Sequence, residues 1–250
     1  MSILLGICNY NIDNYYLNCN DKNIVIKEIK DVFIELDINV IFIKNNLKEI
    51  IWIRDIFVPI DNLYLKCNLT TNSTMKTDRS FEFNFIKHFL KKEKQIIEIP
   101  PNISFEGGDI IQEQNYIFVG IGMRTDIQII SILQQLFPQK NIIPIHHTAL
   151  HLDCCFCILN NTLIFYDSKY IKNLELPSFF TIYDISSIVD SGKYMATNFV
   201  QVGNNLIMSK IKKNATFRKI LRSFGFNIKL VNTQNIWKEG GSIRCLTQWL

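Results

Sequence analysis

The chain has 250 residues, of which 48% are hydrophobic and 20% are charged, and its formal net charge is +4 at pH 7. This composition excludes an intrinsically disordered chain, and the weak, scattered positive charge indicates no nucleic-acid partner. No apolar run reaches the ~18 residues of a membrane span, and no basic segment opens the chain as in a signal peptide, so we expect no membrane association.

The seven cysteines are an odd number, and only Cys154 and Cys157 have CxxC spacing. This pattern is typical neither of a disulfide framework nor of a zinc knuckle. Cys154, Cys155 and Cys157 lie in an apolar run, so we expect them to be buried. The cysteine usage indicates a reducing, cytoplasmic compartment.

The first part of the chain is expected to form a strand over residues 3–8, a helix around 22–36 and a second strand over 39–43. Four hairpins are expected after it. In each, an apolar stretch runs into asparagine, aspartate or glycine and then into a second apolar stretch. The hairpins cover residues 52–65, 108–119, 151–165 and 196–208.

A helix and then a further strand follow most of these hairpins. The helices are expected over residues 81–90, 125–137 and 214–224, and the strands over 96–99, 141–145 and 226–231. Apolar residues recur at helical period between Thr125, the expected N-cap, and Pro138, which ends that helix. The interval 167–180 leaves almost no room for a helix.

The chain is therefore organised as about five strand–strand–helix–strand units of roughly 45–50 residues each. A radial array of such units closes on itself and leaves few sheet edges exposed. The predicted fold is an α/β propeller of five ββαβ blades that forms a single domain over residues 1–250. The alternative is an ordinary α/β domain without a true repeat.

Polar side chains recur at a similar place in the units, at the beginning of the first hairpin strand. They are Asp55, Glu106, Asp109, His151, Asp153 and Asn198. Equivalent positions of a radial array converge on its axis, so we expect these side chains to meet at one mouth. Cys245, expected on the closing strand, would join them there.

Cys245 follows Gly240–Gly241 and stands beside Arg244. Glycines allow a close backbone approach, and a neighbouring cation favours the thiolate. A cysteine with a histidine is a pair typical of covalent catalysis. Clustered carboxylates would repel an anion but accept paired N–H groups from a guanidinium. The set predicts thiolate attack on the central carbon of a guanidine, and the plainer alternative is a frayed tail with a chance cysteine.

Five motifs carry a family resemblance, namely WIRD, FEGGD, FVGIGMRT, HLD and GGSIRCLTQ, in this order between residues 52 and 248. Together they resemble the guanidino-group-modifying enzymes, the pentein superfamily. That superfamily includes arginine deiminase, agmatine deiminase, dimethylarginine dimethylaminohydrolase and the amidinotransferases. The resemblance implies a five-bladed α/β propeller, in agreement with the repeat.

The resemblance also implies roles for individual residues. Cys245 would be the nucleophile that forms a covalent thiouronium, and His151 would protonate the leaving amine and then activate water. Glu106 would bind the guanidinium and orient the site. Asp55 and Asp153 resemble the aspartates that clamp the remaining guanidinium nitrogens. No metal or organic cofactor is implied.

Further residues are assigned to substrate binding. Arg124 matches the arginine that binds the substrate α-carboxylate, and Asn198 has the equivalent axial position in its unit. Asp109 is as readily explained by hydrogen bonds to the Gly107–Gly108 turn as by a substrate contact. Arg244 either tunes the thiol or contacts the carboxylate.

Plainer alternatives remain for the other positions as well. Asp55 with Arg54 could be a surface ion pair, Arg124 a solvated cation and His151 a structural histidine. His146 and His147 are explained by the end of a strand and are left out of the site.

At 250 residues the chain has the dimensions of the dimethylarginine hydrolases and is shorter than the standard arginine deiminases. Two aspartates, however, favour unsubstituted nitrogens, because a methylated nitrogen offers fewer N–H groups to a buried carboxylate. The predicted function is hydrolysis of a small guanidino substrate, arginine or a methylated arginine, to citrulline and ammonia or an amine. The alternatives are an amidinotransferase and a non-catalytic pentein-fold binding protein. A homo-oligomer is compatible with the sequence.

Overall fold

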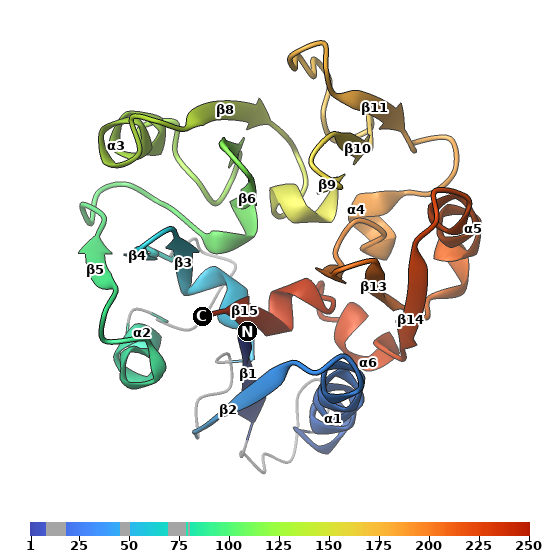
Figure 1. Cartoon of the computed structure of the whole chain (residues 1–250), viewed down its shortest axis with the longest axis horizontal. Coiled ribbons are helices and arrows are strands. Elements are labelled where there is room, and N and C mark those ends of the chain that lie inside the picture. The colour runs from blue at the N-terminus through green and yellow to red at the C-terminus, as the bar shows by residue number, and fades with distance from the viewer. Residues whose placement is uncertain (9–18, 46–50, 70–78, 80) are drawn as a thin grey trace.

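Five three-stranded sheets are arranged around a central axis in the computed structural model of the chain (Figure 1). The structure describes residues 1–8, 19–45, 51–69, 79 and 81–250. In each sheet two strands pair antiparallel and a third strand pairs parallel to one of them. The predicted repeat of five units is confirmed.

The strands of the five blades follow the chain in order, except in the blade that joins its two ends. That blade contains β15 (Thr247–Trp249), β1 (Ser2–Cys8) and β2 (Asn39–Asn45). The second and third blades contain β3 (Phe57–Ile60), β4 (Leu63–Lys66) and β5 (Gln95–Glu98), then β6 (Ile110–Glu113), β7 (Tyr116–Ile121) and β8 (Asn141–His146). The last two contain β9 (Phe156–Leu159), β10 (Leu163–Tyr166) and β11 (Thr181–Asp184), then β12 (Val200–Val202), β13 (Asn205–Ser209) and β14 (Asn227–Val231).

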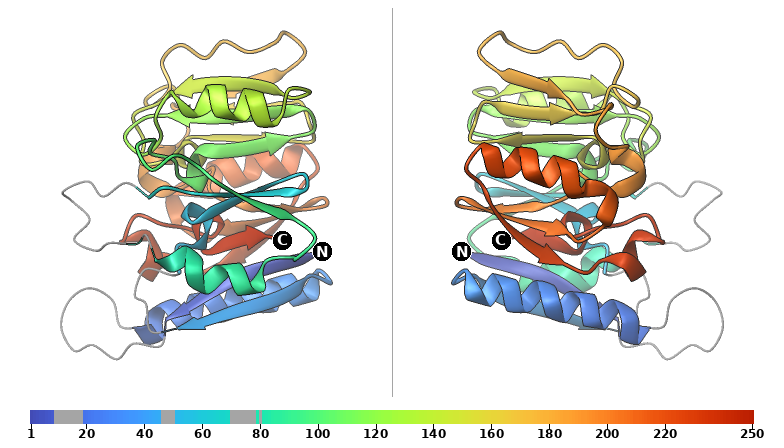
Figure 2. Two further views of the ribbon diagram at one scale, coloured as in Figure 1. Left: turned by 90° about the vertical axis from the view of Figure 1, so that its left-hand side faces the viewer. Right: turned by 90° about the vertical axis from the view of Figure 1, so that its right-hand side faces the viewer.

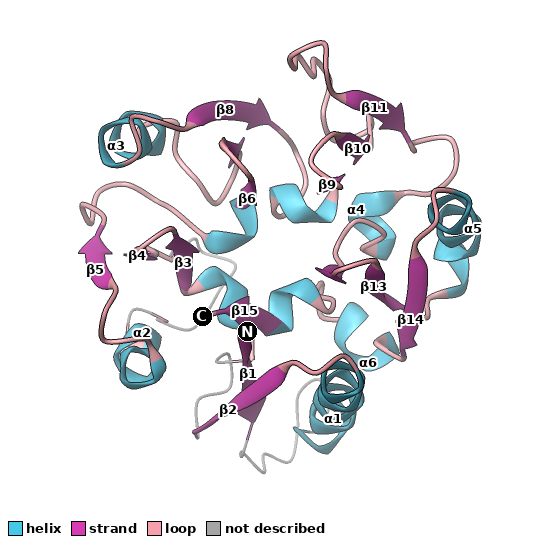
Figure 3. Ribbon diagram, in the orientation of Figure 1, coloured by secondary structure: helices cyan, strands magenta, loops and turns pink. Residues whose placement is uncertain are grey.

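Helices in four of the blades connect the second strand to the third and lie at the periphery (Figure 3). They are α1 (Cys19–Glu35), α2 (Glu82–Ile86), α3 (Ile129–Leu136) and α5 (Ala215–Ser223). Residues 167–180 form no helix, as the sequence predicts. Two further short helices are α4 (Ser191–Tyr194) and α6 (Gln234–Trp237). None of the described helices is long and apolar enough to cross a membrane.

The two ends of the chain close the ring. Strand β15 pairs antiparallel with β1, so that Ile3 lies opposite Trp249, and the N–H of Leu250 donates to the carbonyl of Ser2 at 3.1 Å. The termini accordingly lie side by side in both side views (Figure 2). Ile3, Leu4 and Leu5 of β1 are fully buried, so this last pairing is part of the core.

The core lies between neighbouring blades and under the helices. Phe118 of β7 illustrates the packing between blades: its ring centroid lies 5.3 Å from that of Phe156 of β9 and 5.7 Å from that of Phe180. Burying one such ring contributes about 1.5–3 kcal/mol. Apolar contacts of this kind fix the blades relative to one another and hence the geometry at the axis.

One predicted helix start is wrong. Helix α3 begins at Ile129, after Gln128, and not at Thr125. The hydroxyl of Thr125 donates instead to Asp109 Oδ2 at 2.7 Å and accepts from the backbone N–H of Glu106 at 3.2 Å. Thr125 is therefore a buried part of the axial site. The local sequence assigned the Thr125 side chain to a helix cap, but in the fold this side chain hydrogen-bonds to Asp109 instead.

Candidate active site

Four one-turn 3-10 helices surround the axis (Figure 3). They are η1 (Ile53–Asp55), η3 (Gly107–Asp109), η4 (Leu152–Cys154) and η6 (Arg244–Leu246). They contain Asp55, Asp109, Asp153 and Cys245, and Glu106 and His151 directly precede two of them. Each of the four helices directly precedes, or lies one residue before, the inner strand of its blade.

The sequence analysis placed the polar residues at the beginning of these strands and Cys245 on the closing strand. The structure places them in the turns that precede the strands instead. The reason is local: i→i+3 backbone bonds satisfy peptide groups at the axis, where no strand pairs with them.

His151 and Glu106 form a buried pair. His151 Nε2 lies 2.8 Å from Glu106 Oε2. Burial by itself lowers the pKa of His151, but the charge of Asp55 and the hydrogen bond to Glu106 outweigh it and raise the pKa to about 10. His151 is therefore an imidazolium at neutral pH, able to donate a proton.

Arg124 is buried against the same carboxylate, with its Nη1 3.3 Å from Glu106 Oε1. This contradicts the alternative of a solvated Arg124. Glu106 thus holds two cations, one on each oxygen. A carboxylate with two charged partners is fixed in orientation.

Asp55 is buried, which contradicts the alternative of a surface ion pair. Its Oδ2 accepts from Arg79 Nη1 at 3.2 Å, and its Oδ1 lies 4.0 Å from His151 Nδ1. Burial raises the pKa of Asp55, and the charges of His151 and Arg79 oppose that rise. Arg79 was not singled out by the sequence, and it also pairs with Glu82 at 2.9 Å.

Two carboxylate oxygens at the axis are buried without a hydrogen bond in the part of the chain that the structure describes: Asp55 Oδ1 and Asp153 Oδ2. Asp153 Oδ2 lies 3.3 Å from Arg244 Nε, but outside hydrogen-bond geometry. A buried acceptor without a partner costs about 1–3 kcal/mol. Both atoms are therefore ready to accept N–H groups from a ligand.

Cys245 is 7% exposed. The side-chain amide of Asn198 donates to its sulfur at 3.3 Å and accepts from the backbone N–H of Arg244 at 3.0 Å. Burial, followed by the charges of Asp153 and Asp55, raises the pKa of the Cys245 thiol well above its usual range. With this raised pKa Cys245 is a thiol at neutral pH, and a cation between the two carboxylates would favour its thiolate.

The glycines before Cys245 serve packing. Gly240 has φ +85°, in the left-handed region that glycine adopts freely, and a Cβ on Gly241 would overlap the Trp52 ring. They bring η6 against η1.

Asn198 gives a first testable prediction. Replacing it by alanine removes a hydrogen bond that strengthens when the sulfur ionises, which is worth about 1.5–3 kcal/mol. We expect kcat/KM to fall ~10- to 100-fold. The increase in kcat/KM that accompanies ionisation of Cys245 should move to higher pH. Asn204→Ala, at an exposed turn amide that bonds Gly225, is the matched control. An unchanged pH profile in the Asn198 variant would contradict the contact with the sulfur.

Asp109 connects several elements around the site. Its Oδ2 accepts from Thr125, and its Oδ1 accepts from the backbone N–H of Leu152 at 2.8 Å and lies 3.0 Å from His147 Nε2. It is fully buried, and both oxygens are already hydrogen-bonded. Among the described residues these partners do not include the Gly107–Gly108 turn, so that alternative is wrong, and Asp109 instead bonds Thr125, Leu152 and His147.

His147, like Arg79, lies at the site although the sequence analysis left it out. It lies just after β8 with its side chain fully buried, and Nε2 faces Asp109. The available signal was a second histidine in a short polar interval between two apolar strands, which a strand end explains equally well.

Gly108 gives a second prediction, because a Cβ there would lie 2.6 Å from Cγ of His151. Gly108→Ala should displace the imidazole, cost about 1–3 kcal/mol of stability and lower kcat ~10- to 100-fold. Gly225→Ala is the control: φ +87° there strains any side chain, but no atom lies within 4 Å. If Gly108→Ala kept full kcat, His151 would not act at its observed position.

Asp55, Glu106 and His151 also lie close enough to hold a metal ion, since one ligand atom from each falls within 4.8 Å of the others. Their chemistry fits a cation that brings its own N–H donors better. His151 binds a metal only as the neutral imidazole, so a metal ion would have to displace the ring proton that the neighbouring carboxylates favour.

Comparisons with known proteins agree with the overall fold. The N-terminal domain of ArgZ, a cyanobacterial arginine dihydrolase solved with its product, superposes with a TM-score of 0.81 at 17% identity, covering 99% of this chain and 96% of that one. A mutant DDAH from Pseudomonas aeruginosa, complexed with citrulline, gives a TM-score of 0.80 at 15% identity, covering 98% and 97%.

Two curated relatives were also found. The uncharacterized protein YkgA of Bacillus subtilis is 29% identical over 209 residues, which are 82% of this chain and 71% of YkgA. The bifunctional arginine dihydrolase/ornithine cyclodeaminase AgrE of Nostoc sp. is 24% identical over 207 residues. These cover 78% of this chain but only 29% of AgrE.

The five blades and the structural similarities define the class of protein as a pentein, the fold of the guanidino-group-modifying enzymes. Residues 14–201 match the sequence profile of the family described as Arginine deiminase. This chain belongs to that family.

Proposed function

We propose that the protein hydrolyses a small guanidino substrate, with arginine as the first candidate, by covalent catalysis through Cys245. The observation that carries the proposal is the pair of buried, unbonded oxygens, Asp55 Oδ1 and Asp153 Oδ2, whose charges act on the thiol. A guanidinium supplies the N–H donors that both oxygens lack. Residues 1–250 are the proposed catalytic unit, because η6 and β15 complete the axis.

Substrate binding activates the nucleophile in this proposal. The guanidinium offsets the charges of Asp55 and Asp153, which otherwise hold the Cys245 pKa high, and the thiol then loses its proton to solvent. The amide of Asn198 stabilises the resulting thiolate. The sulfur attacks the guanidine carbon, and a tetrahedral adduct forms.

His151 then transfers a proton to the leaving nitrogen. Glu106 holds Nε2, which leaves Nδ1 as the proton donor. The C–N bond breaks, ammonia or an amine departs, and a thiouronium on Cys245 remains. The now neutral His151 takes a proton from water, the hydroxide adds to the same carbon, and the C–S bond breaks to release a ureido product.

Three features favour arginine. Two aspartates suit unsubstituted nitrogens, because a methyl group in place of N–H would leave a buried carboxylate unpaired. Arg124 lies at the site, and a guanidinium has five N–H donors, enough for Glu106 and a substrate carboxylate together. ArgZ and AgrE, named above, are each described as an arginine dihydrolase.

The test is incubation with arginine, monomethylarginine, dimethylarginine or agmatine, with citrulline, ammonia and ornithine measured. We expect citrulline and ammonia from arginine at the highest kcat/KM. Ornithine with two ammonia would instead indicate a dihydrolase. A new guanidine formed only when glycine is added would indicate an amidinotransferase. No product from any substrate would overturn the proposal and favour a non-catalytic binding protein.

A further inference from the structure

A second opening lies at the other end of the propeller axis from Cys245. The 3-10 turns stand at one end of the hairpins, and the turns that connect the paired strands stand at the other. A cavity of ≈ 790 Å³ lies among those connecting turns. Neither Cys245, His151, Glu106 nor Asp55 lines it. The cavity is thus distinct from the candidate active site.

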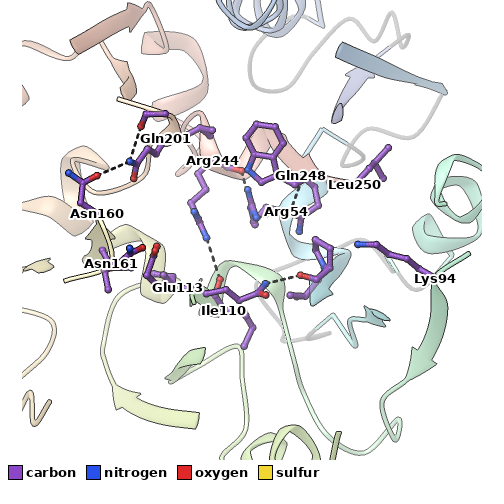
Figure 4. A pocket seen from close by; sticks show the side chains of 18 residues that line it. Arg54, Lys94, Ile110, Glu113, Asn160, Asn161, Gln201, Arg244, Gln248 and Leu250 are labelled. Atoms are coloured by element: carbon purple, nitrogen blue, oxygen red, sulfur yellow. Dashed lines mark hydrogen bonds between the residues drawn. The ribbon is translucent and has the colours of Figure 1, made fainter. Parts of the chain in front are cut away.

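The described lining of this axial cavity is cationic and rich in amides. The cations are Arg54, Arg244 and Lys94, and the amides are Gln112, Asn160, Asn161, Gln201 and Gln248. Glu113 is the one acidic side chain among the described lining residues. In Figure 4 the side chains of Arg54 and Arg244 stand at the centre of the cavity, with Asn160, Gln201 and Lys94 around them. The cavity therefore suits a small anion.

Arg54 is built into the structure and is only 6% exposed. Its Nη1 donates to Gln248 Oε1 at 2.6 Å and its Nε to the carbonyl of Arg244 at 3.2 Å. Its Nη2 is buried without a hydrogen bond in the described part of the chain. Burial, and then the charge of Arg244, lowers the pKa of Arg54 to about 9. An anion would satisfy Nη2 and offset both effects.

Arg244 provides a second, more accessible guanidinium. Its Nη2 donates to the carbonyl of Ile110 at 3.3 Å, while its Nε lies near Asp153. Its side chain is 22% exposed. A guanidinium group is planar and presents paired N–H donors, which match the two oxygens of a carboxylate. The cavity offers two such groups, and neutral amides line the rest of it.

We propose that the axial cavity binds a small carboxylate, held by the guanidinium groups of Arg54 and Arg244. Bound there, the carboxylate competes with Asp153 for the guanidinium of Arg244. It also contacts Arg54, which donates a hydrogen bond to the backbone carbonyl of Arg244, next to Cys245. A freed Asp153 attracts a guanidinium more strongly, so occupancy should lower KM for the guanidino substrate. This last consequence rests on the proposed function, whereas the binding itself does not.

The binding test titrates the purified chain with acetate, succinate or inorganic phosphate by calorimetry, at ionic strength kept constant with chloride. We expect saturable binding of acetate and succinate, weakened ~10-fold or more in Arg54→Gln and in Arg244→Gln. Lys229→Gln, which loses an exposed pair with Glu35, is the control and should bind as the wild type does. If Arg54→Gln does not fold, Lys94→Gln at the rim should still weaken binding.

A competition experiment separates the two sites. Cys245→Ser saturated with arginine should bind succinate with an affinity changed by no more than a few-fold. Displacement of succinate by arginine in direct competition would place the anion in the active site and overturn the proposal. Binding of phosphate alone, or of no probe, would also overturn it. These readouts need no turnover, so failure of the hydrolase proposal is distinguishable from failure of this one.

Discussion

Cys245→Ser is expected to lower turnover of the guanidino substrate by ~10⁴-fold or more while leaving the fold intact, since loss of a nucleophile removes the covalent route. Serine keeps the size of the side chain and a hydrogen bond to Asn198. The pKa of its hydroxyl, however, is too high for the charge of a bound guanidinium to produce the alkoxide at neutral pH. Citrulline formation by the variant and by the wild type, at equal folded concentration, is the measurement.

Cys157→Ser is the matched control. Cys157 lies in β9, is also buried, and undergoes the same change of sulfur to oxygen. We expect this variant to lose some stability and to keep its kcat. Equal activity loss in both variants would point to general damage. Full activity of Cys245→Ser would remove the cysteine from the mechanism.

Glu106→Gln is expected to lower kcat ~10²- to 10³-fold and to change its pH dependence. Without the carboxylate at Nε2, the pKa of His151 should fall from about 10 towards its ordinary value of 6.5. The imidazolium that protonates the leaving nitrogen is then lost at lower pH. The alkaline fall in kcat should therefore move to lower pH in the variant.

The same substitution has a signature in stability. The pKa of His151 is raised in the folded state, so its stabilisation is fully present below pH 6.5 and is lost as the pH rises through about 10. In Glu106→Gln this loss should be smaller and complete at a lower pH, which thermal unfolding across pH 6–10 would measure. Glu98→Gln, at an exposed carboxylate, is the control for charge removal. Identical pH profiles in the Glu106 variant and the wild type would contradict the assigned pair.

The repeat was predictable because its determinants are local. Apolar strands of fixed length, with asparagine, aspartate or glycine at the turns, indicate hairpins without knowledge of what they pack on. Turn positions at Asp61, Asn160 and Gly203 indeed take positive φ. The blade without a helix was equally visible, from the short interval between its strands.

The roles of several polar residues were not predictable, since they depend on partners far away in the chain. Thr125 has the sequence context of a helix cap, yet Asp109 takes its hydroxyl. Arg54 and Asp55 are neighbours in sequence but face opposite ends of the axis: Asp55 bonds Arg79 near the thiol, and Arg54 lines the axial cavity. A motif such as WIRD records which residues occur together and not the direction of each side chain.

The pairing of β1 with β15 has a consequence for the order in which the protein matures. This contact joins residues at opposite ends of the sequence, so its loop-closure cost is among the largest in the fold. A chain still being synthesised can form the blades from β3 to β14 but has neither the last blade nor Cys245. Four completed blades would present carboxylates and a histidine without a nucleophile. Under the proposed mechanism the chain is therefore inactive until the pairing of β1 with β15 completes the ring, because the same segment brings Cys245 to the axis.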